Sequence, residues 1–149
     1  MTVIRPMTRQ DVPAVTAIEH DLFEYDPWSA EMFHLELDQV PNTRDVVVAV
    51  DDGEVVGYAS LRFVGSEGDV NTVAVARHRH GTGVGAVLMQ WLLDAARAHA
   101  VGHLFLEVRS DNHTALGMYE RRGFERIDRR RDYYGPGVDA LVLRKRMAS

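Results

Sequence analysis

The sequence predicts a single α/β domain spanning residues 1–149, built on a mixed and mostly antiparallel β-sheet. Three apolar segments joined by tight turns succeed one another between Arg44 and Ala76, as in an antiparallel meander. The third segment leads through a glycine-rich turn into an amphipathic helix, and another apolar segment follows that helix. This strand, helix, strand order predicts a parallel pair joined by a right-handed crossover. A chain of 149 residues buries roughly 70% of its unfolded surface, which is enough for one domain.

The N-terminal part of the chain predicts one strand and two helices. Thr2–Pro6 is a short strand, and Thr8 caps a helix that reaches Ala17 or Glu19. A turn-rich segment follows, and Ser29 then caps a second short helix because its hydroxyl can accept a hydrogen bond from the first helical turn.

The remainder of the chain predicts six more strands and two more helices, which makes about seven strands and four helices. Apolar residues recur at helical spacing after the glycine-rich turn, at Val84, Val87, Leu88, Trp91, Leu92 and Ala95. The predicted strands are Arg44–Val50, Val55–Val64, a segment ending near Ala76, His103–Val108, Phe124–Arg131 and Val138–Arg144, and the last helix is Asn112–Arg122.

Composition excludes several classes of protein. The absence of cysteine excludes disulfides, thiolate metal sites and a cysteine nucleophile. The seven histidines lack zinc-ligand spacing, so we expect no metal. No apolar run approaches the ~20 residues of a membrane span, and charged residues interrupt the N-terminus where a signal peptide is apolar. We therefore expect a cytoplasmic protein without a membrane partner.

Charge is unevenly distributed along the chain. The formal net charge of -5 argues against direct nucleic-acid binding. The segment from Glu19 to Asp38 contains seven carboxylates and no lysine or arginine. These carboxylates form either a solvated helical face or an acidic rim that attracts a basic substrate. Six arginines between Arg121 and Arg131 either face solvent, balanced by nearby acids, or reach a phosphate or RNA.

The glycine-rich turn, His80-Gly81-Thr82-Gly83-Val84-Gly85, predicts an anion-binding site. Glycines at alternate positions leave backbone N–H groups unshielded at the start of a helix, where the helix dipole adds positive charge. A nucleotide triphosphate loop is excluded, because neither lysine nor a hydroxyl follows Gly85. Dinucleotide binding stays open, since Gly81, Gly83 and Ala86 fit G-x-G-x-x-G/A and Glu107 stands where a ribose-binding acid would.

Together with its flanks, this turn resembles the coenzyme A loop of the GNAT acetyltransferase superfamily, whose signature is Q/R-x-x-G-x-G/A. His80 replaces the usual Gln or Arg, and Arg77 or Arg79 could compensate. The resemblance covers essentially the whole chain. It implies the GNAT fold with a splayed central parallel pair and acetyl-CoA as the co-substrate. The coenzyme-binding residues that it implies are Val73, Ala74, Val75, His80, Gly81, Thr82, Gly83, Val84, Gly85 and Asn112.

A second resemblance, to the RimI-like branch of that superfamily, rests on five stretches in the right order. They are Asp26-Pro27-Trp28-Ser29, Leu106-Glu107-Val108-Arg109, Ser110-Asp111-Asn112, Leu116-x-x-Tyr119-Glu120-x-x-Gly123-Phe124 and Arg131-Asp132-Tyr133-Tyr134. This resemblance implies an enzyme that acetylates the α-amine of the N-terminal alanine of a ribosomal protein. It also implies that Phe23, Trp28, Tyr133 and Tyr134 flank the peptide, although ordinary edge packing explains these aromatic residues equally well.

Acetyl transfer from a thioester to an amine requires a proton acceptor and a proton donor. Glu107 is placed to accept the amine proton, unless it is paired with Arg109 or another arginine. Tyr119 carries a phenol, with a pKa ordinarily near 10, that can protonate a thiolate, unless it is a core tyrosine. Asn112 is placed to cap its helix, to hydrogen-bond the coenzyme arm, or to do both.

Energetics favour an α-amine as the substrate. With reference pKa values of about 8 and 10.4, neutralising the amine at pH 7 costs roughly 1.4 kcal/mol for an N-terminus and roughly 4.6 kcal/mol for lysine. We expect direct transfer in a ternary complex by a monomer or weak dimer. The alternatives are acetylation of lysine or small-molecule amines, a non-catalytic acyl-CoA sensor and an NAD-binding protein.

Overall fold

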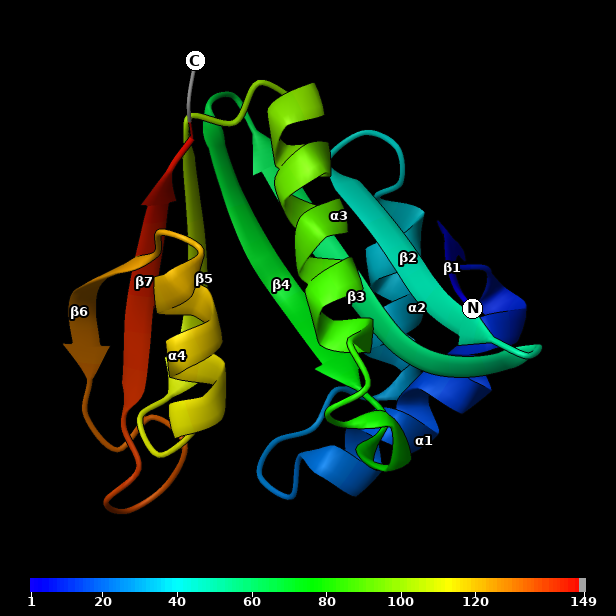
Figure 1. Cartoon of the computed structure of the whole chain (residues 1–149), viewed down its shortest axis with the longest axis horizontal. Helices are drawn as coiled ribbons and strands as arrows, with labels where there is room; N and C mark the ends of the chain where they lie inside the picture. The colour runs from blue at the N-terminus through cyan, green and yellow to red at the C-terminus, as the bar shows by residue number, and fades with distance from the viewer. Residues whose placement is uncertain (148–149) are drawn as a thin grey trace.

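A computed structural model describes residues 1–147 and shows a seven-stranded sheet with helices on both faces (Figure 1). The predicted fold class is confirmed. Its elements are β1 (Thr2–Pro6), η1 (Arg9–Asp11), α1 (Val12–Leu22), α2 (Ala30–Asp38), β2 (Arg44–Asp51), β3 (Glu54–Val64), β4 (Glu67–Val75), η2 (Arg77–Arg79), α3 (Val84–Ala98), β5 (His103–Arg109), α4 (His113–Arg121), β6 (Glu125–Arg130) and β7 (Ala140–Arg146).

The sheet order is β1-β2-β3-β4-β5-β7-β6, and β4 and β5 form its parallel pair. The predicted meander and the predicted parallel pair are both confirmed. Pairing between β4 and β5 covers only Glu67–Asp69 opposite His103–Phe105. Beyond this short ladder the two strands diverge, and the sheet opens into a V (Figure 1).

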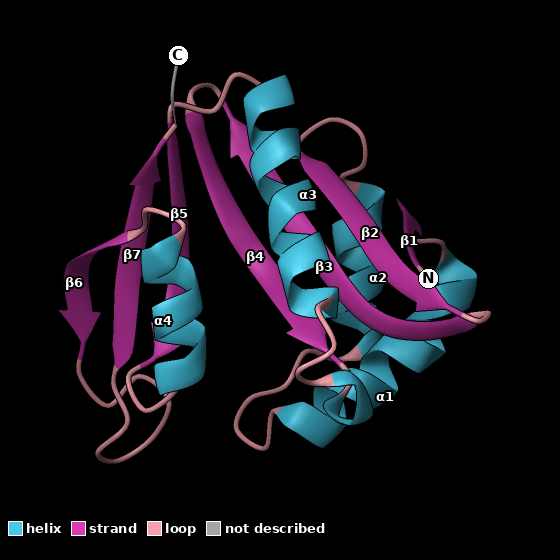
Figure 2. Cartoon of the chain, in the orientation of Figure 1, coloured by secondary structure: helices cyan, strands magenta, loops and turns pink. Residues whose placement is uncertain are grey.

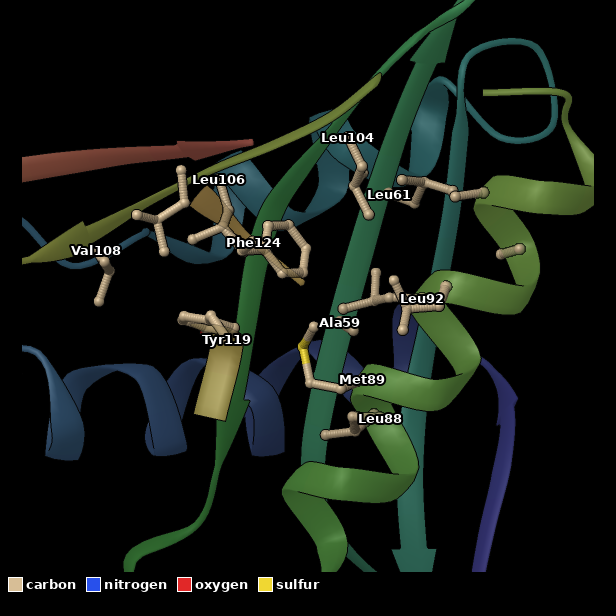
Figure 3. Close-up of a cluster of buried hydrophobic side chains, with 14 of the residues drawn as sticks. Ala59, Leu61, Leu88, Met89, Leu92, Leu104, Leu106, Val108, Tyr119 and Phe124 are labelled. Atoms are coloured by element: carbon tan, nitrogen blue, oxygen red, sulfur yellow. The ribbon is translucent and has the colours of Figure 1, made fainter. Parts of the chain in front are cut away.

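The helices form a layer on each face of the sheet. α3 and α4 lie on one face and α1 and α2 on the other (Figure 2). On the α3 face, Leu88 and Leu92 pack in the same cluster as Leu106 and Tyr119, from the other half of the V (Figure 3). This shared core holds the two halves of the sheet together where no ladder does. None of the helices formed by residues 1–147 has the length and apolarity needed to cross a membrane.

Some predicted details differ from the structure. Val87 is 40% exposed although its spacing predicts a place on the buried stripe of α3, whereas Met89 and Leu93 are buried, because the face that packs on the sheet is rotated away from Val87. The first helix runs on to Leu22, beyond the predicted end. Residues 65–68, Gly65-Ser66-Glu67-Gly68, are predicted as a turn, but β4 already begins at Glu67, since Glu67 and Gly68 pair with the end of β3.

Gly57 controls how closely β3, β4 and α3 approach one another. A Cβ atom at this position would lie 2.9 Å from the Ala74 carbonyl oxygen and 3.0 Å from Leu88 Cδ1. Gly57→Ala should therefore lower the free energy of unfolding by about 1–3 kcal/mol, because backbone and core must shift to accept one methyl group. Urea denaturation measures this loss.

Gly117 in α4 provides the matched control. A Cβ there meets only the flexible end of Arg121, at 3.1 Å. Gly117→Ala should instead raise the free energy of unfolding by up to about 1 kcal/mol through helix propensity. Equal effects of the two alanine substitutions would contradict this view of the β3–β4–α3 contact.

Candidate active site

The opening between β4 and β5 forms a groove that consists of two adjoining cavities. The wider cavity has a volume of about 740 Å³ and the narrower one about 220 Å³. Both are lined by the segment between α1 and α2, by β4, by β5 and by the segment between β6 and β7. Each of these four walls contributes a residue that lines both cavities, and these residues are Trp28, Asn71, Glu107 and Tyr134.

The groove brings together residues that the sequence analysis selected from distant parts of the chain. The narrower cavity is lined by both predicted catalytic residues, Glu107 and Tyr119. Its lining also includes Phe23, Trp28, Val73, Asn112 and Tyr134, whereas Tyr133 lines the wider cavity. An acid, a phenol and an aromatic wall therefore face one space.

The main chain at the end of β4 is presented to this opening. The Ala76 N–H donates to the Val56 carbonyl at 2.8 Å, and antiparallel ladders alternate the direction of successive residues. The backbone groups of Val73 and Val75 therefore point toward the gap. Those of Ala74 point toward β3, so Ala74 offers less to a ligand than the other two predicted residues.

The glycine-rich turn adopts a conformation that glycine permits and other residues resist. Gly81 and Gly83 have φ values of 78° and 93°, in the left-handed region, and Gly83 is the N-cap of α3. A Cβ atom added at either position would meet nothing within 4 Å, so the surface above them is open. The Thr82 hydroxyl donates to the Arg79 carbonyl at 2.5 Å and closes the turn. The start of α3 thus suits an anion.

Basic side chains around this turn are engaged within the protein. His80 Nε2 lies 2.7 Å from the Val75 carbonyl oxygen. Arg77 pairs with Asp21 at 3.2 Å, and Arg79 pairs with Asp51. The expectation that Arg77 or Arg79 replaces the usual Gln or Arg stays a prediction, because Arg77 pairs with Asp21 in an exposed contact that costs little to break. Backbone N–H groups at the start of α3 can hold an anion without either arginine.

Glu107 pairs with Arg130, whose Nη1 lies 3.1 Å from Glu107 Oε1. This pair bears out the alternative that Glu107 is paired with Arg109 or another arginine, and the partner is not Arg109, which makes two hydrogen bonds of 3.0 Å to Asp111. Arg130 is half-exposed, as expected for the solvated arginine face of residues 121–131, and it also lines the wider cavity. The carboxylate of Glu107 is partly exposed and accessible from the groove.

Tyr119 is buried, and its ring contacts that of Phe124 edge-on at a centroid distance of 5.8 Å. Burial, with a smaller contribution from Tyr134, raises the pKa of Tyr119 to about 12. The expectation of a pKa near 10 is therefore corrected, because a buried phenolate loses its hydration. Tyr119 stays protonated at physiological pH and is a weaker acid than expected. Burial and the nearby Glu107 also raise the pKa of Tyr134.

Asn112 forms the N-cap of α4, where its side-chain oxygen accepts a hydrogen bond from the Ala115 N–H at 3.2 Å. The capping role expected for it is confirmed. Asn112 also lines the narrower cavity.

Glu19 was not singled out by sequence as a site residue, although it shapes the groove. It is buried and accepts hydrogen bonds from the Tyr58 hydroxyl at 2.6 Å and the Trp28 N–H at 3.0 Å. It thereby fixes Trp28 in the groove wall. The available signal was its position, seven residues after Val12 and four after Val15, which places a carboxylate on the apolar stripe of α1.

Glu36 is a second buried carboxylate that sequence reasoning placed on the acidic rim. It accepts hydrogen bonds from Arg44 Nε at 2.9 Å, Ser60 Oγ at 2.5 Å and Asn71 Nδ2 at 2.8 Å. Because Asn71 lines both cavities, these bonds tie α2 to the groove. Neither alternative for the carboxylates between Glu19 and Asp38 describes these two buried residues.

Comparisons with known proteins agree with this geometry. Residues 13–124 match the Acetyltransferase (GNAT) family. The chain is 38% identical over 148 residues to the N-alpha-acetyltransferase RimI of Mycobacterium tuberculosis, covering 95% of this chain and 90% of that protein. It is 30% identical over 146 residues to a ribosomal protein bS18-alanine N-acetyltransferase of Salmonella typhimurium, covering 96% of each.

The fold is also shared with a solved structure. The ribosomal-protein-S18-alanine N-acetyltransferase of Escherichia coli superimposes with a TM-score of 0.88 at 26% identity, covering 100% of this chain and 96% of that one. The family match, the two relatives and the splayed sheet all agree, and the protein therefore belongs to the GNAT family of acetyltransferases.

Proposed function

We propose that the protein transfers an acetyl group from acetyl-CoA to the α-amine of the N-terminal alanine of ribosomal protein S18. The observation that carries this proposal is the convergence of Glu107, Tyr119 and an aromatic wall on one groove beside the open end of β4. The names of the relatives support the substrate, since two of them are bS18 or S18 alanine N-acetyltransferases. The reaction would take place in the cytoplasm, where ribosomal proteins are made.

The residues at the open end of β4 offer groups that suit acetyl-CoA, which supplies the acetyl group as a thioester. The turn at Gly81 and Gly83 offers backbone N–H groups to the pyrophosphate. The main chain of Val73 and the Val75 N–H offer hydrogen-bonding groups to the amide-bearing arm, whereas the Val75 carbonyl is already bound to His80. Membership in an acetyltransferase family favours this ligand over a dinucleotide.

The side chains of the groove supply the proton transfers. The neutral amine forms a bond to the thioester carbon, Glu107 accepts the proton that the amine nitrogen loses, and the carbon–sulfur bond breaks. The Tyr119 hydroxyl donates a hydrogen bond to the departing sulfur. With a pKa of about 12, Tyr119 is a weaker acid than an ordinary thiol of pKa about 8.5, so this hydrogen bond stabilises the thiolate, and the proton that Glu107 has accepted from the amine neutralises it.

The groove also suits a basic polypeptide. The carboxylates of Asp26, Glu67 and Asp69 line the wider cavity together with Glu107. Carboxylates gathered in a cleft attract a positively charged chain and favour its approach. Acetylation of lysine or of small-molecule amines is the alternative within the family, and an acyl-CoA sensor is the alternative without catalysis.

Removing either reactive side chain should abolish most of the turnover. Glu107→Gln and Tyr119→Phe are each expected to lower kcat by about 10²–10³-fold, because a positioned proton donor or acceptor contributes that much. Mass spectrometry of S18 after incubation with enzyme and acetyl-CoA measures modification of its N-terminus. Calorimetry serves as the control and should show nearly unchanged acetyl-CoA affinity. Binding without any acetylation by the unmodified protein would indicate a sensor, and modification only at internal lysines would refute the proposed substrate.

The raised pKa of Tyr119 predicts how activity responds to alkaline pH. A tyrosine whose pKa rises to about 12 keeps its proton well above pH 10, where an exposed tyrosine ionises. The value of kcat should therefore not fall between pH 8 and 10 through this residue. In an absorbance titration of the unmodified protein, the tyrosinate signal of Tyr119, identified by its absence in Tyr119→Phe, should appear only above pH 11. An alkaline decline near pH 10 that disappears in Tyr119→Phe would contradict this.

Backbone N–H groups, and not His80, should hold the coenzyme. His80→Ala is expected to change the acetyl-CoA dissociation constant by less than about threefold, because its imidazole is bound to the Val75 carbonyl. Gly83→Ala should weaken binding far more, since an alanine resists the left-handed conformation by about 1–2 kcal/mol. Calorimetric titration compares the two variants. A tenfold loss in His80→Ala would assign the pyrophosphate to the imidazole.

A further inference from the structure

Arg130 is the single cation among the described residues that line the wider cavity of the groove. Four carboxylates line the same cavity, those of Asp26, Glu67, Asp69 and Glu107. Such a cleft attracts positively charged groups of every kind. Selection among amines therefore depends on which group contacts Glu107, the carboxylate that accepts the proton in the proposed reaction.

The register of the strands places Arg130 beside the carboxylate of Glu107. Arg130 ends β6 and pairs with Ala140 of β7, while β7 places Val142 opposite Glu107 of β5. The guanidinium lies 3.1 Å from Glu107 Oε1, and its Cζ lies 5.6 Å from the ring centroid of Tyr133. A carboxylate and an aromatic face thus hold the same cation.

The contact places Arg130 on the Glu107 carboxylate, and it is exposed enough to be displaced. The side chain of Arg130 is 51% exposed and that of Glu107 is 30% exposed. Ion pairs of this kind exchange with water at little cost. By contrast, Arg109 is bound to Asp111 through two hydrogen bonds, so it does not compete for Glu107.

Arg130 discriminates between amines by their charge. A protonated amine must displace the guanidinium to reach Glu107, and two cations so close together repel one another. A neutral amine brings no charge and can approach the carboxylate beside Arg130. With reference pKa values of about 8 and 10.4, about one N-terminus in ten is neutral at pH 7, against about one lysine in 2,500.

We propose that Arg130 is a specificity-determining residue, which occupies Glu107 before the substrate binds and excludes protonated side-chain amines, so that α-amines are acetylated and lysines are not. The inference rests on the proposed function, in which Glu107 accepts the amine proton. It assigns the choice between α-amine and lysine to one ion pair.

Two matched peptides test this role. One has a free N-terminal alanine and no lysine, and the other has a blocked N-terminus and one internal lysine. Arg130→Gln should lower the ratio of kcat/KM for the first peptide to that for the second by about tenfold, with the lysine peptide gaining activity. Butylammonium should inhibit Arg130→Gln about fivefold more tightly than the unmodified protein, as loss of one exposed ion pair allows.

Two variants separate this role from a structural one. Arg130→Lys keeps the charge and should retain most of the selectivity. Arg126→Gln removes an equally exposed arginine of β6 that pairs with Glu120 at 3.2 Å, and should leave both the ratio and the inhibition unchanged. If Arg130→Gln does not fold by circular dichroism, Arg130→Met takes its place.

The outcomes distinguish this inference from the proposed function. If the unmodified protein acetylates the first peptide while Arg130→Gln leaves the ratio and the inhibition unchanged, the inference is overturned and the proposed function stands. A parallel loss of both activities in a folded Arg130→Gln variant overturns it as well. If the unmodified protein acetylates neither peptide, the proposed function itself fails.

Discussion

The short ladder between β4 and β5 is the constraint on which the site depends. Only Glu67–Asp69 and His103–Phe105 pair, so each strand is free on its inner side beyond these residues while it remains paired on its outer side with β3 or β7. The strands stay ordered where they separate, and their main chain is presented to a groove. Main-chain groups exposed in this way need partners, which a ligand with amide groups can supply.

The far wall of the groove is fixed by buried charge. Glu19 holds Trp28 and Tyr58, and Glu36 holds Asn71 through its side-chain amide. Buried carboxylates contribute little net stability, because desolvation offsets the bonds that they make. What they provide here is position, since each joins a helix to a residue that lines the groove. A wall fixed in this way needs no rearrangement of the segment between α1 and α2 to face Glu107.

Sequence patterns predicted the strands and the parallel pair, because periodicity and turn chemistry are local signals. The acid at Glu107 and the phenol at Tyr119 could be selected because the β5–α4 segment is nearly continuous. The partner of Glu107 could not be found in this way. Arg130 reaches it across β7, through the register of two ladders that no local pattern specifies. The pKa of Tyr119 was missed for a related reason, because burial sets it, in a core that joins Phe124 with Leu88 and Leu92 of the distant helix α3.

Under the proposed function, the start of α3 and the groove follow different rules of recognition. At the start of α3 acetyl-CoA would meet main chain, and the conformation of Gly81 and Gly83 would matter more than the identity of His80. At the amine end, in the groove, recognition would depend on side-chain charge, with Glu107 and Arg130 in direct contact. A backbone site tolerates changes in neighbouring side chains, whereas a site built on one ion pair changes its selectivity when either partner changes. Differences in substrate choice among relatives should therefore trace to the amine end, and to the residues that β6 and β7 bring to it.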